Sequence, residues 1–92
     1  MAERIEHDSM GDVLVPSDAL WGAQTERSRN NFLIGDGREV MPPEIIRAFG
    51  FLKKAAALAN AELVPTRMTA EKCSAICSAA DEVISGQLNA HF

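Results

Sequence analysis

The longest regular pattern of apolar and polar positions lies in residues 42–63. Apolar side chains recur there at steps of three and four residues, which places them on one face of an α-helix. Two prolines open the segment, where a missing N–H group costs little, and Gly50 is a weak helix former, at about 1 kcal/mol relative to alanine. The pattern predicts a helix that packs through its apolar face, whose members are Ile45, Phe49, Leu52, Ala56 and Ala59, with Ile46 and Leu63 beside them.

A second helical pattern begins after Pro65, which makes continuation of the first helix unfavourable. Thr69 is a good N-cap and Gly86 a natural C-cap, so we predict a helix between them. Two helices joined by so short a link form an antiparallel helical hairpin, which we expect to be the core of the chain. The apolar face of the second helix consists of Cys73, Ile76, Cys77, Ala80, Val83 and Ile84.

The N-terminal part of the chain contains two short segments with β character. We expect residues 1–4 to be loose and to be followed by strands at residues 5–8 and 13–15, joined through a turn that contains Gly11. Pro16 ends the second strand. A hairpin this short is not stable alone, so we expect it to pack against helices.

A polar stretch follows, in which we expect a short helix. Thr25 is a reasonable N-cap for a helix that runs to Phe32. Trp21 and Phe32 are the aromatic residues that would anchor this polar helix to the fold. Residues 1–92 are therefore predicted to be a single, mainly α domain, with a small N-terminal β-hairpin, a short helix and an antiparallel pair of longer helices.

Length and composition limit this fold to one small domain. The chain has 92 residues, of which 47% are hydrophobic and 24% charged, as is ordinary for a globular protein. Its formal net charge of −4 argues against nucleic-acid binding, which normally uses a basic face. No apolar run is long enough to span a membrane, and the acidic N-terminus lacks the apolar segment of a secretion signal. We therefore expect a cytoplasmic protein that binds neither nucleic acid nor membrane.

The two cysteines, Cys73 and Cys77, are four residues apart and so share one face of the second helix. Side by side on one helix, their Cβ vectors do not converge as a disulfide requires. A zinc site would need further ligands, and the two histidines lie near opposite ends of the chain. We expect core thiols and no metal site, because free cysteine is commonly a buried small hydrophobe.

Several short motifs follow one another along the chain. DSMG stands at residues 8–11, LWGAQT at 20–25, MP at 41–42, LKKAAA at 52–57 and AADEV at 79–83. In this order the motifs closely resemble the N-terminus of class II fumarases, which belong to the fumarase/aspartase superfamily. The resemblance covers the chain from Ile5 onward, and the WGAQT signature is similar to fumarases, whereas aspartases usually carry a tyrosine and a different dipeptide there.

This resemblance implies the N-terminal, structural part of a longer lyase, whose full-length form reversibly hydrates fumarate to L-malate in the tricarboxylic acid cycle. It also implies a homotetramer without metal or other cofactor. The acid, base and substrate groups of the family come from later motifs, among them Gly-Ser-Gly-Thr-Gln, which do not occur in this sequence. We therefore expect no catalytic residue in this chain and no activity from residues 1–92 alone. We also expect the isolated chain to dimerise through its helical hairpin.

Four side chains are candidates for a place near the chemistry. The resemblance implies that the N-terminal loop lies close to an active site, which makes Thr25 and Arg27 the substrate-adjacent candidates, since an arginine attracts a dicarboxylate. The alternative is that Arg27 ties this loop to the helices. His7 stands between two carboxylates in an exposed arrangement that is usually inert, and His91 is a tail histidine without an orienting partner in the sequence.

Two other functions stay open at this point. One is the N-terminal part of an aspartase-type ammonia-lyase from the same superfamily, which differs in adding ammonium to fumarate in place of water. The other is a non-catalytic helical module that self-associates or binds a partner.

Overall fold

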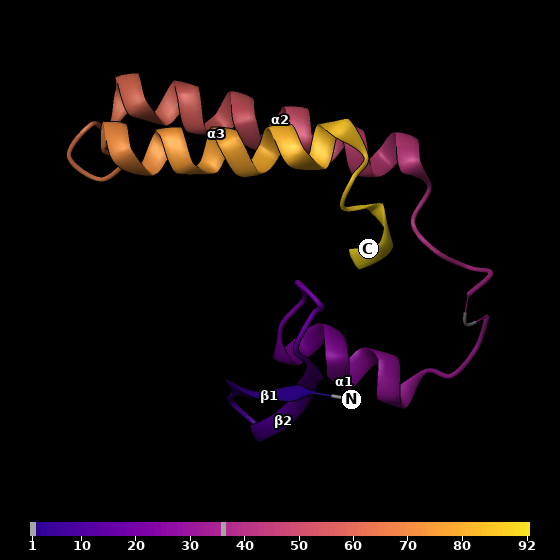
Figure 1. The fold of residues 1–92 in the computed structure, drawn as a ribbon. Coiled ribbons are helices and arrows are strands. Elements are labelled where there is room, and N and C mark those ends of the chain that lie inside the picture. The colour runs from indigo at the N-terminus through magenta and orange to yellow at the C-terminus, as the bar shows by residue number, and fades with distance from the viewer. Residues whose placement is uncertain (1, 36) are drawn as a thin grey trace. The chain divides into compact units, whose positions relative to one another are not determined.

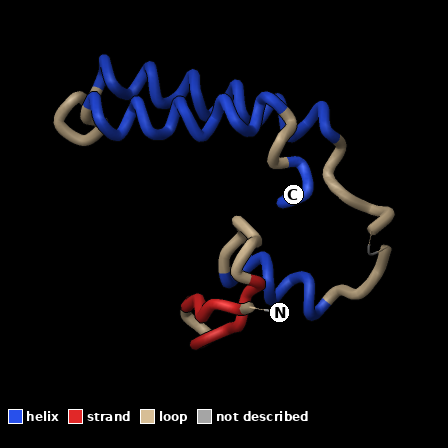
Figure 2. The backbone as a smooth tube through the Cα atoms, in the orientation of Figure 1, coloured by secondary structure: helices blue, strands red, loops and turns tan. Residues whose placement is uncertain are grey.

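A computed structural model describes residues 2–35 and 37–92 of the chain (Figures 1 and 2). The chain divides into two compact units, residues 1–40 with His91 and residues 41–90 with Phe92. Each unit has its own small set of buried side chains. Among the described residues, none of the helices combines the length and the apolar composition that crossing a membrane requires.

The first unit begins with an antiparallel β-hairpin of β1 (Glu3–Asp8) and β2 (Gly11–Pro16), drawn as red strands in Figure 2. The ends of the two strands pair with each other, so a two-residue turn closes the hairpin. Gly11 has a φ of 112°, a conformation that residues with a Cβ rarely adopt, which explains a glycine at the start of β2. Val15 is fully buried and provides the main apolar contact of β2.

The hairpin confirms the predicted pair of strands but starts earlier. The sequence predicts a loose segment over residues 1–4, of which Met1 lies outside the described residues. Glu3 and Arg4 belong to β1, so the prediction is wrong for these two residues. The reason is that the Arg4 side chain binds backbone carbonyls that follow β2, which orders a charged segment without any apolar signal of its own.

A short helix, α1 (Ala23–Asn31), confirms the helix predicted in the polar stretch, although its start differs. Gly22 is the N-cap, and its carbonyl already accepts a helical hydrogen bond from the Glu26 N–H at 3.1 Å. Thr25 therefore lies inside the first turn, and its prediction as the N-cap is wrong. A glycine offers no side-chain cap, so the sequence carries no local signal for this start.

Trp21 and Phe32, the two aromatic anchors predicted for this helix, behave differently. Trp21 is half-buried in the segment before α1, where its indole N–H has a buried partner. Phe32 follows the last residue of α1 and is 68% exposed, so its prediction as an anchor is wrong within this chain. Besides Val15, the buried apolar residues in the described part of this unit are Ala19 and Ala23.

The second unit is an antiparallel helical hairpin of α2 (Pro43–Leu63) and α3 (Ala70–Ser85), which lie side by side in Figure 1. Both helices begin and end close to the predicted residues. Thr69 caps α3 by accepting a hydrogen bond from the Lys72 N–H at 3.3 Å, and Gly86 ends the helix in the left-handed conformation, at a φ of 87°. The predicted fold class, mainly helical with one small hairpin, is confirmed. A short 3-10 helix, Asn89–His91, was not predicted.

The face through which α2 packs differs from the predicted one. The buried residues of α2 are Ile46, Gly50 and Ala57. The predicted face is largely exposed, as Phe49 shows with an exposed fraction of 43%. The reason lies at Gly50, where a Cβ would come within 2.7 Å of the Cγ1 atom of Ile84. The absence of a side chain lets α3 approach α2 along this line, so the glycine that weakens the isolated helix permits its packing.

Candidate functional site

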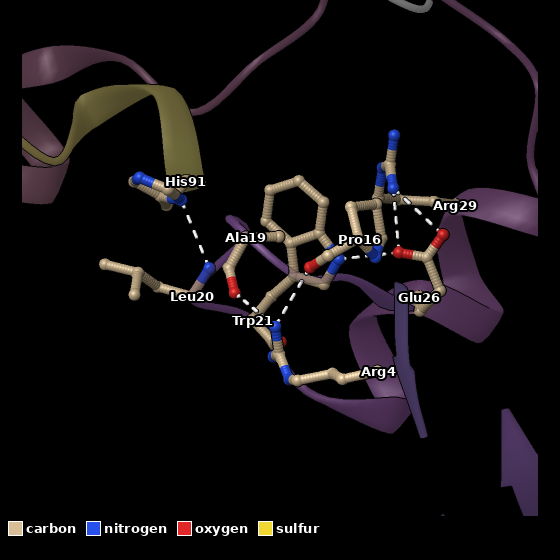
Figure 3. A network of polar contacts seen from close by, with 8 residues as sticks. All are labelled: Arg4, Pro16, Ala19, Leu20, Trp21, Glu26, Arg29 and His91. Atoms are coloured by element: carbon tan, nitrogen blue, oxygen red, sulfur yellow. Dashed lines mark hydrogen bonds and ion pairs between the residues drawn. The ribbon is translucent and has the colours of Figure 1, made fainter. Parts of the chain in front are cut away.

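Three charged side chains of the first unit, Arg4, Glu26 and Arg29, lie around the segment between β2 and α1 (Figure 3). Arg4 of β1 makes most of the contacts with this segment. Its Nη1 donates to the carbonyl oxygens of Pro16 at 2.9 Å and Ala19 at 2.7 Å, and its Nη2 donates to that of Trp21 at 2.6 Å. Its Nε donates to the Glu6 carboxylate at 2.8 Å. One planar group with five N–H donors thus holds several carbonyls of a segment that has no helix or strand of its own.

Glu26 of α1 is the second centre of this network, and only 6% of it is exposed. Its carboxylate accepts the indole N–H of Trp21 at 2.6 Å and hydrogen bonds from Nη1 of Arg29 at 2.8 and 2.9 Å (Figure 3). The Arg29 guanidinium also lies over the Trp21 ring, 4.5 Å from the ring centroid, in a cation–π contact. The buried carboxylate is therefore compensated, and Trp21 is held by its side chain as well as by its carbonyl.

Arg27, one of the two predicted substrate-adjacent residues, binds the β-hairpin. Its Nε donates to Oδ2 of Asp8 at 2.7 Å, and its Nη2 donates to the Gly11 carbonyl at 3.1 Å. The Asp8 side chain is only 8% exposed. The hydrogen bond from Arg27 holds the pKa of Asp8 below its ordinary value, and the same bond raises the pKa of Arg27. Arg27 thus ties α1 to the turn of the hairpin. This contact is similar to the alternative given for Arg27 above, in which the arginine connects parts of the fold and does not bind substrate.

Thr25, the other predicted substrate-adjacent residue, is exposed in the first turn of α1. Side chains two residues apart on a helix do not face each other, so the structure does not bring the hydroxyl of Thr25 and the guanidinium of Arg27 together. An exposed hydroxyl in a first helical turn is available to a ligand as donor and acceptor. The two candidates therefore differ in their surroundings, one open to solvent and the other engaged within the unit.

Both histidines have partners that the sequence does not predict. His7 pairs with Asp12 across the hairpin, and its Nδ1 is hydrogen-bonded to the Asp12 carboxylate, with both side chains largely exposed. His91 belongs to the first unit, where its Nδ1 accepts the Leu20 N–H at 3.2 Å and its ring centroid lies 6.2 Å from that of Trp21. His91 therefore has an orienting partner, contrary to the prediction, and this hydrogen bond makes Nδ1 the acceptor nitrogen.

The charged groups that make the contacts described above serve to hold the fold of the first unit. Among residues 2–35 and 37–92, no three His, Cys, Asp or Glu side chains are placed together to hold a metal ion. In the same residues, every buried side-chain nitrogen or oxygen has a hydrogen-bond partner. The network can therefore fix the position of a loop and of a helix start. Proton transfer to a substrate would need a group that is not already committed in this way.

The second unit has an open apolar groove along its two helices. The groove has a volume of about 520 Å³, and its lining includes Phe49 and Gly50 of α2 together with Ile76 and Val83 of α3. Sites for small polar ligands usually add a few convergent polar groups to an apolar lining. This groove is therefore suited to burying another apolar surface rather than to orienting a dicarboxylate.

Sequence reasoning selected residues of α1 but missed Arg4 and Glu26. Arg4 lies in the charged start of β1, where the sequence does not distinguish it from a solvated side chain. Glu26 lies in a helix of mostly polar residues, which suggests exposure on all sides. One usable signal was the spacing of Glu26 and Arg29, three residues apart on a helix, shortly after a tryptophan whose indole N–H needs an acceptor when buried.

Comparison with known proteins gives a consistent result. A sequence profile of the lyase family matches residues 11–92. The class II fumarate hydratase of Bacillus cereus is 53% identical to this chain, and that of Thermus thermophilus 55%, each over all 92 residues. The chain spans 19% of the length of each of these relatives.

Solved structures agree with this result. The class II fumarase of Schistosoma mansoni matches with a TM-score of 0.90 at 34% identity, over 99% of this chain and 19% of that one. The fumarate lyase:delta crystallin of Brucella melitensis matches with a TM-score of 0.84 at 38% identity, again over 99% of this chain and 19% of its own. Since the matches cover nearly the whole chain, they include the β-hairpin as well as the helices.

Proposed function

Because this chain belongs to the lyase family, we propose that it forms the N-terminal structural portion of a class II fumarate hydratase. The observation that carries the proposal is the identity of 53% and 55% with two such enzymes over all 92 residues. In this proposal the complete enzyme adds water reversibly to fumarate and gives L-malate. Since the chain spans 19% of those relatives, the acid and base of the reaction would come from other segments.

The proposed role of residues 1–92 is to position, not to react. Hydration of fumarate needs a base, an acid and a group that stabilises the charge developing on a carboxylate. The charged groups at the centre of the first unit are engaged with one another or with backbone carbonyls, as the contacts of Arg4, Glu26 and Arg27 illustrate. These contacts favour one conformation of the segment before α1 and of the first turn of α1. Residues 1–92 alone are therefore proposed to be inactive.

Thr25 and Arg27 are proposed to lie beside the substrate site of the complete enzyme, with different roles. The exposed hydroxyl of Thr25 is available to the substrate or to a group that binds it, whereas Arg27 orients α1 through its bond to Asp8. In the full-length protein, Thr25→Val removes the hydroxyl and keeps the side-chain shape. We expect the KM for fumarate to rise severalfold with kcat little changed, because the variant loses an interaction that binds the substrate and the transition state equally well. Thr66→Val, in an exposed turn, is the matched control, and an unchanged KM in Thr25→Val would contradict the role of Thr25.

The complete enzyme is further proposed to be a cytoplasmic homotetramer that acts in the tricarboxylic acid cycle. For the isolated chain we propose dimerisation through the α2–α3 hairpin, because Phe49, Phe51 and Leu58 are 43%, 53% and 52% exposed on α2. Light scattering over a range of concentrations tests this state. A monodisperse monomer that binds no apolar dye would contradict it.

A sister lyase of the aspartase type is the second candidate. The chain is also 38% identical to the fumarate lyase:delta crystallin of Brucella melitensis, and this similarity is the reason to test for a sister lyase as well. Expression of the native gene in full, followed by assays with fumarate in water and with fumarate plus ammonium, separates the two. Hydration without a need for ammonium supports the fumarate hydratase. Turnover that depends on ammonium would replace it by the sister enzyme.

A further inference from the structure

The two cysteines of the chain stand on successive turns of α3 with their sulfur atoms close together. The Sγ atoms of Cys73 and Cys77 are 4.0 Å apart. Cys73 is buried, with its Sγ 3.6 Å from the carbonyl oxygen of Ala57 on α2, and Cys77 is half-buried. Both are free thiols, and the sequence contains no other cysteine. The pair therefore presents two sulfur atoms on one face of the helix, with Cys77 the more accessible.

Two common uses of a cysteine pair do not fit this geometry. A disulfide needs an S–S distance of about 2.0 Å and converging Cβ vectors, which successive turns of one helix do not provide. A structural zinc ion needs four ligands, and in the part of the chain that the structure describes no third His, Cys, Asp or Glu is placed to complete such a set. A ligand that suits this pair has to bind two sulfur atoms and need no further bond from the protein.

We propose that Cys73 and Cys77 form a two-thiol site for trivalent arsenic that carries one organic group. An organoarsenous acid, R–As(OH)2, exchanges both hydroxyl groups for the two sulfurs. Two S–H bonds and two As–O bonds break, two As–S bonds and two O–H bonds form, and the two hydroxyl groups leave as water with the thiol protons. Arsenic stays trivalent, so the step needs no oxidant or reductant. Two bonds of about 2.3 Å, the length of a zinc–thiolate bond, reach at most about 4.6 Å from one sulfur to the other, so a single atom can bridge the observed 4.0 Å.

The burial of the pair favours this ligand over a metal cation. Burial and the hydrogen bond with Cys73 raise the pKa of Cys77, since the neutral thiol is favoured in these surroundings. A metal–thiolate bond requires deprotonated sulfur there, whereas the arsenic bridge leaves both sulfurs uncharged. Lys54 and Asp81, the charged residues next to Cys77, form an ion pair at 2.7 Å and so already compensate each other.

The test uses phenylarsine oxide and the 92-residue chain, kept reduced by a phosphine that contains no thiol. We expect one phenylarsenic group per chain in native mass spectrometry. The group should be retained against excess glutathione and removed by a dithiol such as dimercaptopropanol. Cys73→Ser and Cys77→Ser should each lose this retention, because a single As–S bond is displaced by a monothiol.

A matched control keeps two thiols but separates them. In the double variant Cys77→Ser with Ser78→Cys, the thiols are five residues apart and point about 140° apart around the helix, against about 40° for the native pair. We expect phenylarsine oxide to bind this variant about a hundredfold more weakly, because the second bond loses the advantage of forming within the chain. Circular dichroism of each variant verifies that the helix is retained.

Two results would overturn the proposal. Equal retention by the native pair and the shifted pair would mean that the spacing on α3 is irrelevant. Absence of an adduct on the folded native chain would mean that packing against α2 closes the site, whether or not denaturant restores the reaction. Neither result would bear on the proposed hydratase function, since the cysteine pair is argued from its own geometry.

Discussion

Each of the two units of this chain is stabilised by a different kind of internal contact. In the first, Arg4, Glu26 and Arg27 bind backbone carbonyls, an indole and carboxylates. In the second, α2 and α3 approach each other closely at Gly50 and Ala80. A Cβ atom added to Gly50 would lie 3.2 Å from the carbonyl oxygen of Ala80, which is a tight contact. One unit depends on directed hydrogen bonds between charged groups, and the other on close contact of small residues.

The difference follows from the kind of backbone that each unit has to order. A segment without regular structure keeps one conformation when its carbonyl and N–H groups find partners, and a guanidinium satisfies several of them at once. Two helices are already hydrogen-bonded internally and are stabilised instead by dispersion contacts and by the apolar area they bury. We therefore expect the first unit to respond to changes of charge and the second to changes of side-chain volume.

Two spectroscopic signals separate the units. Trp21 is the one tryptophan of the chain, so its fluorescence reports the network around Glu26. Far-ultraviolet circular dichroism reports mainly the second unit, because α2 and α3 have 21 and 16 residues against nine in α1. Urea unfolding followed by both signals measures the free energy of unfolding that each unit contributes.

The largest effect is expected from Gly50→Val. A Cβ at this position would lie 2.7 Å from Cγ1 of Ile84, so α3 has to move away from α2. We expect the free energy of unfolding of the second unit to fall by about 3 kcal/mol, the upper end of the cost of overpacking. The transition seen by circular dichroism should shift and the Trp21 transition should not. Ala55→Val, at an exposed position of α2, places the same β-branched side chain where α3 does not approach, and an equal loss in both variants would contradict the close approach.

Glu26→Gln addresses the first unit. The amide keeps the size of the side chain but removes the charge that the Arg29 guanidinium and the Trp21 indole share. We expect a loss of about 1.5 kcal/mol, within the range for disturbing a buried hydrogen bond to a charged group, together with a shift of the Trp21 emission. Glu62→Gln, on an exposed position of α2, is the control. If both variants leave the fluorescence transition unchanged, the carboxylate of Glu26 does not hold the tryptophan.

A smaller effect is expected at the start of α3. Thr69→Ala removes the hydroxyl that accepts the Lys72 N–H, which should cost about 1 kcal/mol in the second unit. Thr66→Ala, in the exposed turn before this helix, removes a hydroxyl that does not cap α3. The difference between the two variants, measured by circular dichroism in urea, isolates the cap. Equal losses in the two variants would contradict a stabilising cap at Thr69.

The pH dependence of the first unit gives the smallest expected signal. Because Arg27 lowers the pKa of Asp8 in the folded state, the stabilisation is fully present above the ordinary aspartate pKa and is lost as pH falls through the lowered value. We expect acid to shift the Trp21 transition, and Asp8→Asn to remove part of that dependence. Asp18→Asn, at an exposed position before α1, is the control. An identical acid profile for Asp8→Asn and the native chain would contradict the role of the Asp8–Arg27 pair.

The ends of the longer helices could be predicted because their signals are local. Thr69 offers a hydroxyl to a free N–H group, Gly86 adopts a positive φ, and Pro65 stops the preceding helix, each without help from distant residues. The packed face of α2 could not be predicted in the same way. Gly50 looks like a weak point in the sequence, and only the approach of α3 shows why it is there.

In the candidate site, too, the features with a local sequence signal could be predicted and those that depend on distant contacts could not. The short motifs between residues 8 and 83, taken in their order along the chain, carried the resemblance to a family, since such a resemblance depends on residue order alone. The burial of Glu26 and the carbonyl contacts of Arg4 depend on the hairpin and α1 meeting in space, so no window of sequence contains them. Charged residues that look solvated were therefore the ones whose position sequence reasoning missed.

The most direct test compares fumarate hydration, followed by the loss of ultraviolet absorbance, for residues 1–92 and for the protein expressed from the full native gene. We expect turnover by the full-length protein and none by residues 1–92, because Arg4, Glu26 and Arg27 are committed to holding the fold of the first unit and the proposed acid and base lie in other segments. Turnover by residues 1–92 alone would contradict the positioning role and would return Arg27, His7 and His91 to the list of reacting groups.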